Sequence, residues 1–408
     1  MELRPITDDE FDDWRKAFSV VFGFDPRDED REVFAAVNEM DRSIGVFEEG
    51  SIVGTGGAFT FSMTVPGGDS VGAAGVTLIA VMPSHRRRGI LTSMMRHQLQ
   101  DVREHEEPTA ILWASESLIY GRYGYGMAIE ASDLTISRER GSFRPDIPQP
   151  SGQMRIVTDL EEARKVVPAL YDTSTIQAGI PGSLTRSESA WGVYFHDPEH
   201  WRDGLSAVRF GIYERSGEPA GYMRYRQKMD WPDMHPAHTV NIGDLHAVDG
   251  EAYSALWRFA LGLDLVTEIK APNRPLHDPV GALVADPRRI RRSVGDSIWV
   301  RIVDIPAALA ARRYGAEDRL VLEVVDEFMP DVGGRFVLEG GPGGAVCEPT
   351  TAEPDMTLSV ADLGAAYLGD SRFATLQWLG RVEATPEVAA RARAMFSWHP
   401  SPWCTVHF

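Results

Sequence analysis

Residues 76–91 read VTLIAVMPSHRRRGIL. The run from Val76 to Val81 is apolar and rich in β-branched residues, and it stops before Pro83, so it predicts a buried strand. Apolar residues then recur at helical spacing, which predicts an amphipathic helix: Leu91, Met94, Met95, Leu99 and Val102. The segment is therefore expected to be a strand, a short turn and a helix.

The turn between the strand and the helix is basic and contains a glycine: Arg86, Arg87, Arg88 and Gly89. The first turn of a helix has free N–H groups, and the helix dipole adds partial positive charge there, so a basic turn at this point attracts phosphate. Glycine lets the backbone approach the ligand closely. The pattern predicts a pyrophosphate site, with an exposed basic turn between a core strand and a surface helix as the alternative.

The order R-x-x-G after a V-x-P strand end resembles the acetyl-CoA loop of the GCN5-related N-acetyltransferase (GNAT) superfamily, which usually reads Q/R-x-x-G-x-G/A. Arg86 and Gly89 match this loop, whereas Leu91 occupies its last small position. The resemblance implies that acetyl-CoA is a co-substrate and that it is contacted by the following residues: Val81, Arg86, Arg87, Gly89 and Ile90.

The length and charge of the chain narrow its class. At 408 residues it is too long for one ordinary core, so two or three domains are expected. The net charge of −19 argues against nucleic acid as a partner, because phosphate binding needs an excess of Lys and Arg. An acidic protein is instead suited to attract a cationic small molecule such as an amine.

The cysteines and the N-terminus point to a reducing compartment. Cys347 and Cys404 cannot make a disulfide framework, and the acidic start MELRPITDDEFDDW lacks the apolar centre of a signal peptide. No apolar run is long enough to cross a bilayer, so a cytoplasmic protein is expected. No metal is expected either, because the nearest approach to metal-ligand spacing, H-P-A-H at 235–238, reads as a polar loop.

The first domain is expected to span residues 1–140. Strand-like stretches precede and follow the basic turn and its helix: 43–47, 52–63, 71–81 and 110–114. The segment RGSFRPDIPQPSGQ at 140–153 is rich in Pro, Gly and Ser, so it is interpreted as a linker.

The second domain is expected at 154–295 and repeats the strand–helix–strand order of the first. Its predicted elements are a hairpin over 207–227, a strand at 239–245, a helix at 253–263 and a strand at 265–269. Between that strand and helix, residues 246–251 read HAVDGE, with acids where a phosphate site needs arginines. We therefore expect a degenerate GNAT-like unit that does not bind CoA.

The third domain is expected at 297–408. Its predicted strands are 319–326, 334–340, 354–360 and 382–384, and its predicted helices are 361–368 and 386–396. A few strands with helices on one side make an α+β layer, and the element order resembles the sterol-carrier-protein fold. The expected fold class is therefore α/β and α+β, with two GNAT-like domains in tandem followed by a sterol-carrier-protein-like domain.

A second motif, WASESLIYGRYGYGMA, occupies residues 113–128. Its glycines at 121, 124 and 126 predict tight turns among three tyrosines. A tyrosine ring usually packs in a core or an interface, and this is the role expected of Tyr123 and Tyr125. Tyr120 is a candidate for chemistry.

The HRRRGIL loop, the W-A-S-E and I-Y-G-R-Y-G-Y-G strings and the aromatic C-terminus together resemble the Eis (enhanced intracellular survival) family of aminoglycoside acetyltransferases, over essentially the whole chain. In that family the first tyrosine of I-Y-G-R is the general acid, which implies this role for Tyr120. The family's general base is the α-carboxylate of a C-terminal phenylalanine, which matches Phe408, and Ser115 matches a serine that contacts CoA. The resemblance also implies a homo-hexamer.

These residue types suit acetyl transfer to an amine, which forms an oxyanion, expels a thiolate and removes a proton from nitrogen. The N–H of Val81 can polarise the thioester carbonyl. Tyr120, with an ordinary pKa of about 10, keeps its proton at neutral pH and can give it to the departing sulfur. A terminal carboxylate, with an ordinary pKa of about 3.5, can hold an ammonium and accept its proton if the site raises that pKa. The apolar ending WCTVHF indicates a terminus that is tucked in.

His407 departs from the family pattern, in which an acidic residue precedes the terminal phenylalanine. An imidazole there weakens the capture of a polyamine. The expected function is acetyl-CoA-dependent N-acetylation of primary amines, on aminoglycoside-type or other polyamine substrates. Two alternatives stay open: acetylation of lysine side chains in proteins or peptides, and a non-catalytic protein that uses the fold as a scaffold to bind a lipid or a partner.

Overall fold

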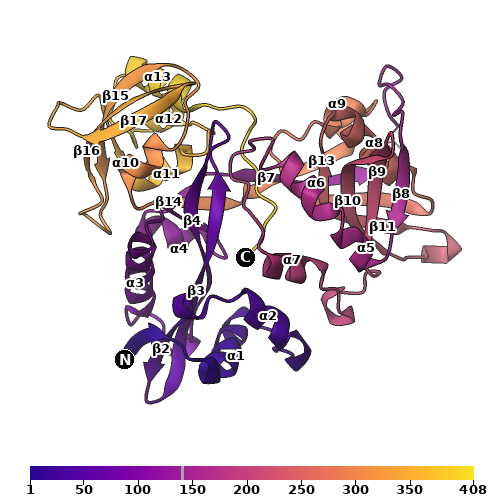
Figure 1. The fold of residues 1–408 in the computed structure, drawn as a ribbon, viewed down its shortest axis with the longest axis horizontal. Coiled ribbons are helices and arrows are strands. Elements are labelled where there is room, and N and C mark those ends of the chain that lie inside the picture. The colour runs from indigo at the N-terminus through magenta and orange to yellow at the C-terminus, as the bar shows by residue number, and fades with distance from the viewer. Residues whose placement is uncertain (139–141) are drawn as a thin grey trace. The chain divides into compact units, whose positions relative to one another are not determined.

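The computed structural model describes residues 1–138 and 142–408 (Figure 1). The chain divides into two compact units. The first contains Met1–Ile129, Pro181–Val193 and Ser297–Phe408, and the second contains Glu130–Ile180 and Tyr194–Asp296.

A seven-stranded sheet lies at the centre of the N-terminal part of the first unit. In spatial order its strands are β1 (Glu2–Pro5), β2 (Ile44–Glu48), β3 (Ser51–Thr64), β4 (Ser70–Val81), β5 (Thr109–Trp113), β14 (Ile298–Ile302) and β6 (Gly126–Met127). Neighbours are antiparallel except β4 and β5, which are parallel and are joined through helix α3 (Ile90–Glu104). The strand, turn and helix predicted from 76–91 are thus confirmed.

Helices cover both faces of this sheet. On one face α1 (Phe11–Phe22) packs Trp14 and Phe18 against Phe47 and Ala80, and the Trp14 indole donates a 2.8 Å hydrogen bond to the carbonyl of Ile44. On the other face α3 buries the apolar stripe predicted for it, including Met94 and Leu99. The short helices α2 (Arg31–Val37) and α4 (Ser117–Tyr120) complete this part of the unit.

The C-terminal part of the first unit is a four-stranded sheet with helices. Its strands, in spatial order, are β17 (Gly344–Pro349), β16 (Gly334–Gly341), β15 (Asp318–Val325) and β18 (Met356–Ser359). Its helices are α10 (Ile305–Ala310), α11 (Val360–Ala366), α12 (Phe373–Trp378) and α13 (Pro386–Phe396). The predicted strand at 382–384 is reduced to a single bridge between Thr357 and Glu383.

Glycines let α11 pack directly on the first sheet. A Cβ at Gly126 would lie 1.8 Å from the carbonyl oxygen of Ala361, and a Cβ at Gly364 would lie 2.4 Å from that of Val300. No real side chain tolerates such distances, so only glycine allows this approach. The C-terminal helices and strands β6 and β14 therefore form one packed body.

The second unit is built around another seven-stranded sheet. Its strands, in spatial order, are β13 (Ile290–Asp296), β7 (Glu130–Ser137), β12 (Val266–Pro275), β11 (His238–Ala247), β10 (Glu218–Lys228), β9 (Arg209–Arg215) and β8 (Gln153–Val157). Its helices are α5 (Leu160–Arg164), α6 (Val167–Ser174), α8 (Gly250–Gly262) and α9 (Val280–Leu283), and the division between the units falls within α7 (Glu188–Phe195). Parallel strands β11 and β12 with α8 between them confirm the predicted strand–helix–strand repeat.

Two strands lie in sheets that the predicted domain ranges did not assign to them. The predicted boundary at residue 140, where the expected linker begins, lies outside the described residues. The strand before it, β7, pairs with β12 and β13 of the second sheet. Strand β14, at the start of the range predicted as 297–408, pairs with β5 and β6 of the first sheet.

Candidate active site

Strands β4 and β5 part in the middle of the first sheet. Residues Ala73–Gly75 pair with Thr109–Ile111, and the structure shows no further ladder between the two strands in its described part. A bulge lies just beyond, where Leu78 has φ 55° and its carbonyl accepts a 2.9 Å hydrogen bond from the Thr55 hydroxyl. From Val76 to Val81, the edge of β4 that faces β5 is therefore open, which leaves room for a ligand between the strands.

The predicted anion loop lies at the N-terminus of α3. Gly89 is the N-cap residue with φ 80°, and a Cβ there would meet nothing within 4 Å. No side chain caps the helix. Among the residues described, neither Arg86 nor Arg87 has an ion-pair partner. Free helix N–H groups, unpaired arginines and open space fit the pyrophosphate of acetyl-CoA.

Ile90 takes a more limited part in this site. Its side chain is buried in the core with Val46, Val53 and Met94. Only its backbone can therefore face a ligand. Val81 is the last residue of β4 and is partly buried.

Glu48, at the end of β2, holds the other basic residues of the loop. Its carboxylate accepts hydrogen bonds of 2.6 and 3.0 Å from Arg88 and lies 2.8 Å from Nε2 of His85. The hydrogen bond from Arg88 lowers the pKa of Glu48 below its usual value. Glu48 thus holds Arg88 and His85 in place, whereas Arg86 and Arg87 have no ion-pair partner among the described residues. Sequence reasoning missed it because nothing near Glu48 in the sequence indicates this contact.

Tyr120 ends α4 and is followed by a helical turn at Gly121–Tyr123. The side chain is buried, and its ring meets that of Tyr125 edge to face at 6.1 Å. Burial raises the pKa of the Tyr120 hydroxyl, while a hydrogen bond with the exposed Ser115 side chain acts in the opposite direction. The hydroxyl therefore stays protonated at neutral pH. Tyr123 and Tyr125 are buried core residues, as the sequence predicted.

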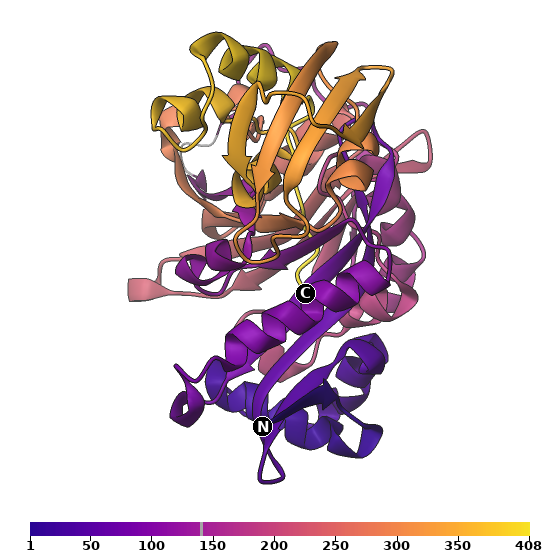
Figure 2. The ribbon, with the colours of Figure 1, turned by 90° about the vertical axis from the view of Figure 1, so that its left-hand side faces the viewer.

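The C-terminal residues dock where β4 and β5 part. The Trp113 indole, at the end of β5, donates a 3.0 Å hydrogen bond to the carbonyl of Val406 and stacks on His407. The Phe408 ring lies 5.1 Å from the Phe61 ring of β3. Figures 1 and 2 both place the C-terminal end beside β3 and β4.

Gly75 makes room for the two rings. A Cβ at this position would lie 2.4 Å from a ring carbon of Phe61 and 3.0 Å from a ring carbon of Phe408. Gly75 is also the last residue of β4 that pairs with β5. The terminal phenylalanine is therefore seated at the point where the two strands separate, which the sequence had indicated only as a tucked-in end.

Neither a metal centre nor a spanning helix is found in residues 1–138 and 142–408. No group of three or more His, Cys, Asp or Glu side chains there could hold a metal ion. No helix in the same residues is long and apolar enough to cross a membrane. His238 of the H-P-A-H segment begins β11 and packs against Trp231.

Comparison with protein families assigns three segments of the chain. Residues 2–128 and 182–302 each match an acetyltransferase (GNAT) domain, and residues 305–405 match a sterol carrier protein domain. This order confirms the predicted fold class.

Individual proteins resemble the chain over most or all of its length. An uncharacterized N-acetyltransferase of Streptomyces avermitilis is 42% identical, over 98% of each chain. The N-acetyltransferase Eis of Mycobacterium tuberculosis is 35% identical, over 81% of this chain and 79% of Eis. The crystal structure of Eis1 from Mycobacterium abscessus superposes with a TM-score of 0.86 at 32% identity, over the full length of both.

Proposed function

Because the chain belongs to the Eis-like family of GNAT N-acetyltransferases, we propose that it transfers the acetyl group of acetyl-CoA to primary amines, with Tyr120 as general acid and the Phe408 carboxylate as general base. Acetyl-CoA supplies an acetyl thioester, whose carbonyl carbon bonds to the amine nitrogen as the carbon–sulfur bond breaks. The residues of the chain bind this co-substrate, orient the amine and move two protons.

Binding of the co-substrate is assigned to the N-terminus of α3 and the parted strands. Arg86, Arg87 and the first N–H groups of α3 hold the pyrophosphate. The open end of β4 at Val81 offers a backbone N–H to the thioester carbonyl, where negative charge develops in the transition state. Ser115 is assigned to a CoA contact beside Tyr120.

The single observation that carries the proposal is that the C-terminal residues are packed in a fixed position. Chain ends are normally frayed, but this one is held by Trp113 and rests on Phe61 and Gly75, beside the gap between β4 and β5. A carboxylate fixed there can hold an ammonium and accept its proton. Tyr120, kept protonated by burial, gives its proton to the departing sulfur.

The acceptor is proposed to be an aminoglycoside-type or other polyamine substrate. The net charge of −19 favours a cationic acceptor. His407 adds no negative charge beside the carboxylate, so an acceptor with fewer amines is expected to compete well with a polyamine. Lysine side chains of peptides are the second candidate acceptor.

The experiment is thiol release from acetyl-CoA with several aminoglycosides, a polyamine, a lysine peptide and a no-amine control. Amine-dependent release is expected. A protein lengthened by a single glycine after Phe408 should lose it, because the carboxylate moves by about 3.5 Å along an extended chain. The control is a protein with one glycine added before Met1. Full activity of the lengthened protein would remove the terminal carboxylate from the mechanism.

Assembly and location complete the proposal. We propose a cytoplasmic homo-hexamer of the 45.2 kDa chain. Light scattering coupled to size exclusion measures the mass of the particle directly, and a monomeric mass at assay concentration would contradict the hexamer.

A further inference from the structure

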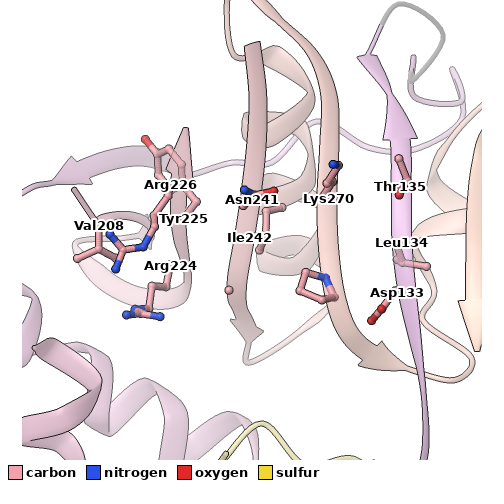
Figure 3. Close-up of a pocket in the computed structure, with 12 residues that line it drawn as sticks. Asp133, Leu134, Thr135, Val208, Arg224, Tyr225, Arg226, Asn241, Ile242 and Lys270 are labelled. Atoms are coloured by element: carbon pink, nitrogen blue, oxygen red, sulfur yellow. The ribbon is translucent and has the colours of Figure 1, made fainter. Parts of the chain in front are cut away.

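A pocket of about 430 Å³ lies on the sheet of the second unit. Its lining comes from four neighbouring strands, β10, β11, β12 and β7, together with Val208, as Figure 3 shows. Side chains alternate between the faces of a strand. On β10, Met223 and Tyr225 belong to the core under α8, whereas Arg224 and Arg226 project from the other face. The pocket therefore opens on the face opposite α8.

Arg224 brings to this pocket a guanidinium that pairs with no carboxylate in residues 1–138 and 142–408. Its Nη2 donates one 3.3 Å hydrogen bond, to the carbonyl of Tyr194, and the group lies 4.7 Å from the centre of the Tyr194 ring. Its buried Nε has no hydrogen-bond partner in the part of the chain that the structure describes. An arginine in this state retains donors for an anion.

The other charges of the lining leave the pocket cationic. Arg226 is neutralised by Asp197 at 2.5 Å. Among the residues that the structure describes, Lys270, half-exposed on β12, has one loose contact with a carboxylate, that of Glu268 at 3.5 Å. Asp133 is the carboxylate in the lining. It lies on β7, which is separated from β11 by β12, and it accepts a hydrogen bond from the N–H of Asn273. In a chain of net charge −19, such a surface is unusual.

Strand β11 forms the floor of the pocket, that is, the backbone surface between Arg224 and Lys270. It runs between β10, which carries Arg224, and β12, which carries Lys270. Its ladder with β10 is irregular at Gly243, and a Cβ at Gly243 would lie 3.4 Å from Nη1 of Arg224. The arginine thus lies against a residue that has no side chain. Asn241, on the same strand, adds an amide donor.

We propose that this pocket binds a small organic anion, with its carboxylate or phosphate over β11 between Arg224 and Lys270. The apolar part of the ligand lies on Pro272, which also lines the pocket on this face. This site differs from the CoA position of a GNAT domain. The N-terminus of α8, where a pyrophosphate would bind, is capped by Asp249, which accepts the N–H of Ala252.

The test is calorimetric titration of the full-length protein with 1-naphthyl phosphate and with naphthalene-1-carboxylate, in the presence of saturating CoA. At least one of these anions should bind once per chain, and which of them binds identifies the preferred head group. Neutral 1-naphthol should bind at least about tenfold more weakly, because it lacks the charge-assisted hydrogen bonds.

Variants assign the binding to the pocket. Arg224→Gln removes the main cation, and Gly243→Leu fills the floor while leaving every charge in place. Each substitution should raise the Kd of the anion by about tenfold or more. Arg209→Gln is the matched control, because it removes one arginine from β9 outside the lining. Lys270→Gln changes an exposed side chain and tests the site even if the other variants fold poorly.

Thermal melting identifies any variant that does not fold. The absence of anion binding with CoA present would overturn the proposal. So would binding that the folded Arg224, Gly243 and Lys270 variants leave unchanged.

Discussion

The indole of Trp113 stacks on the imidazole of His407, with ring centroids 4.2 Å apart and planes inclined by 26°. The same indole donates a hydrogen bond to the carbonyl of Val406. Two contacts from one residue thus hold the chain just before Phe408. We therefore propose Trp113 as a positioning residue for the terminal carboxylate.

Trp113→Ala should reduce kcat. A lost stack and a lost hydrogen bond together are worth about 1–3 kcal/mol, so the tail should be docked less of the time and kcat should fall by about fivefold or more. The Kd of acetyl-CoA should hardly change. Steady-state kinetics check this, with Trp378→Ala as the control because Trp378 is 81% exposed. An unchanged kcat would mean that the tail stays docked without Trp113.

Tyr120→Phe should lower kcat by at least about tenfold, because it removes the proton donor while keeping the buried ring. Acetyl-CoA should bind as before, which equilibrium titration measures. Tyr123→Phe is the matched control, since that hydroxyl has one weak hydrogen bond, of 3.3 Å with Thr92, among the described residues. Wild-type turnover in the Tyr120 variant would contradict the role of general acid.

Glu48→Gln should raise the KM for acetyl-CoA several-fold and leave kcat unchanged, because it releases Arg88 and His85 from their shared carboxylate. Since Arg88 lowers the pKa of Glu48, the pairing is present above the ordinary glutamate pKa of about 4.3 and is lost as the pH falls. The effect should therefore be constant across neutral pH. Glu49→Gln provides the control. Equal KM values for both variants would contradict a role of Glu48 in ordering the loop for acetyl-CoA.

The buried pair of Arg301 on β14 and Asp326 after β15 should be important for stability. Both side chains are almost fully buried, and Asp326 also accepts the N–H groups of Phe328 and Met329. Asp326→Ala leaves a buried charge unpaired, which costs about 3–5 kcal/mol of unfolding free energy. Asp331→Ala breaks the exposed pair with Arg103 and should cost under about 1 kcal/mol. Urea unfolding compares the two, and similar losses would contradict this interpretation.

Alkaline pH should destabilise the fold. Burial raises the pKa values of Tyr125 and Tyr367 well above normal. Unfolded tyrosines ionise near pH 10 while these remain protonated, so the stability contribution is complete below about pH 10 and declines above it. Urea midpoints measured from pH 8 to 11 should show the decline.

Tyr125→Phe identifies part of this effect. The Tyr125 hydroxyl is buried and has no hydrogen-bond partner among the residues that the structure describes. The variant should therefore be as stable as the wild type at pH 8 and should show a shallower decline above pH 10. A decline as steep as that of the wild type would assign the loss to other groups.

Much of the fold could be predicted because its signals are local. The apolar run that forms the end of β4 and the helically spaced residues that form α3 each lie within a short stretch of sequence. The positions of β7 and β14 could not be predicted in this way. Strand pairing joins residues far apart in the sequence, and no local pattern shows which sheet an apolar strand will enter.

The residues of the candidate site likewise fall into those with a local sequence signal and those that only folding brings together. The basic loop with Gly89, the tyrosine of I-Y-G-R and the terminal phenylalanine are all readable in the sequence, and the family resemblance supplied their roles. Glu48 and Trp113 were missed, because each acts on a partner that only folding brings near. That Nε of Arg224 lacks a hydrogen-bond partner in the described part of the chain is likewise visible only in the fold.

The sequence by itself thus predicted the family and the chemical types in the proposed active site through the resemblance of its motifs. It predicted many of the strands and helices because periodicity, glycine and charge act on neighbouring residues. Tertiary structure alone decided that the last residue of the chain reaches the gap between β4 and β5. It did so because the rings of Phe61, Trp113 and Phe408 and the bare backbone of Gly75 fit together only when distant segments pack.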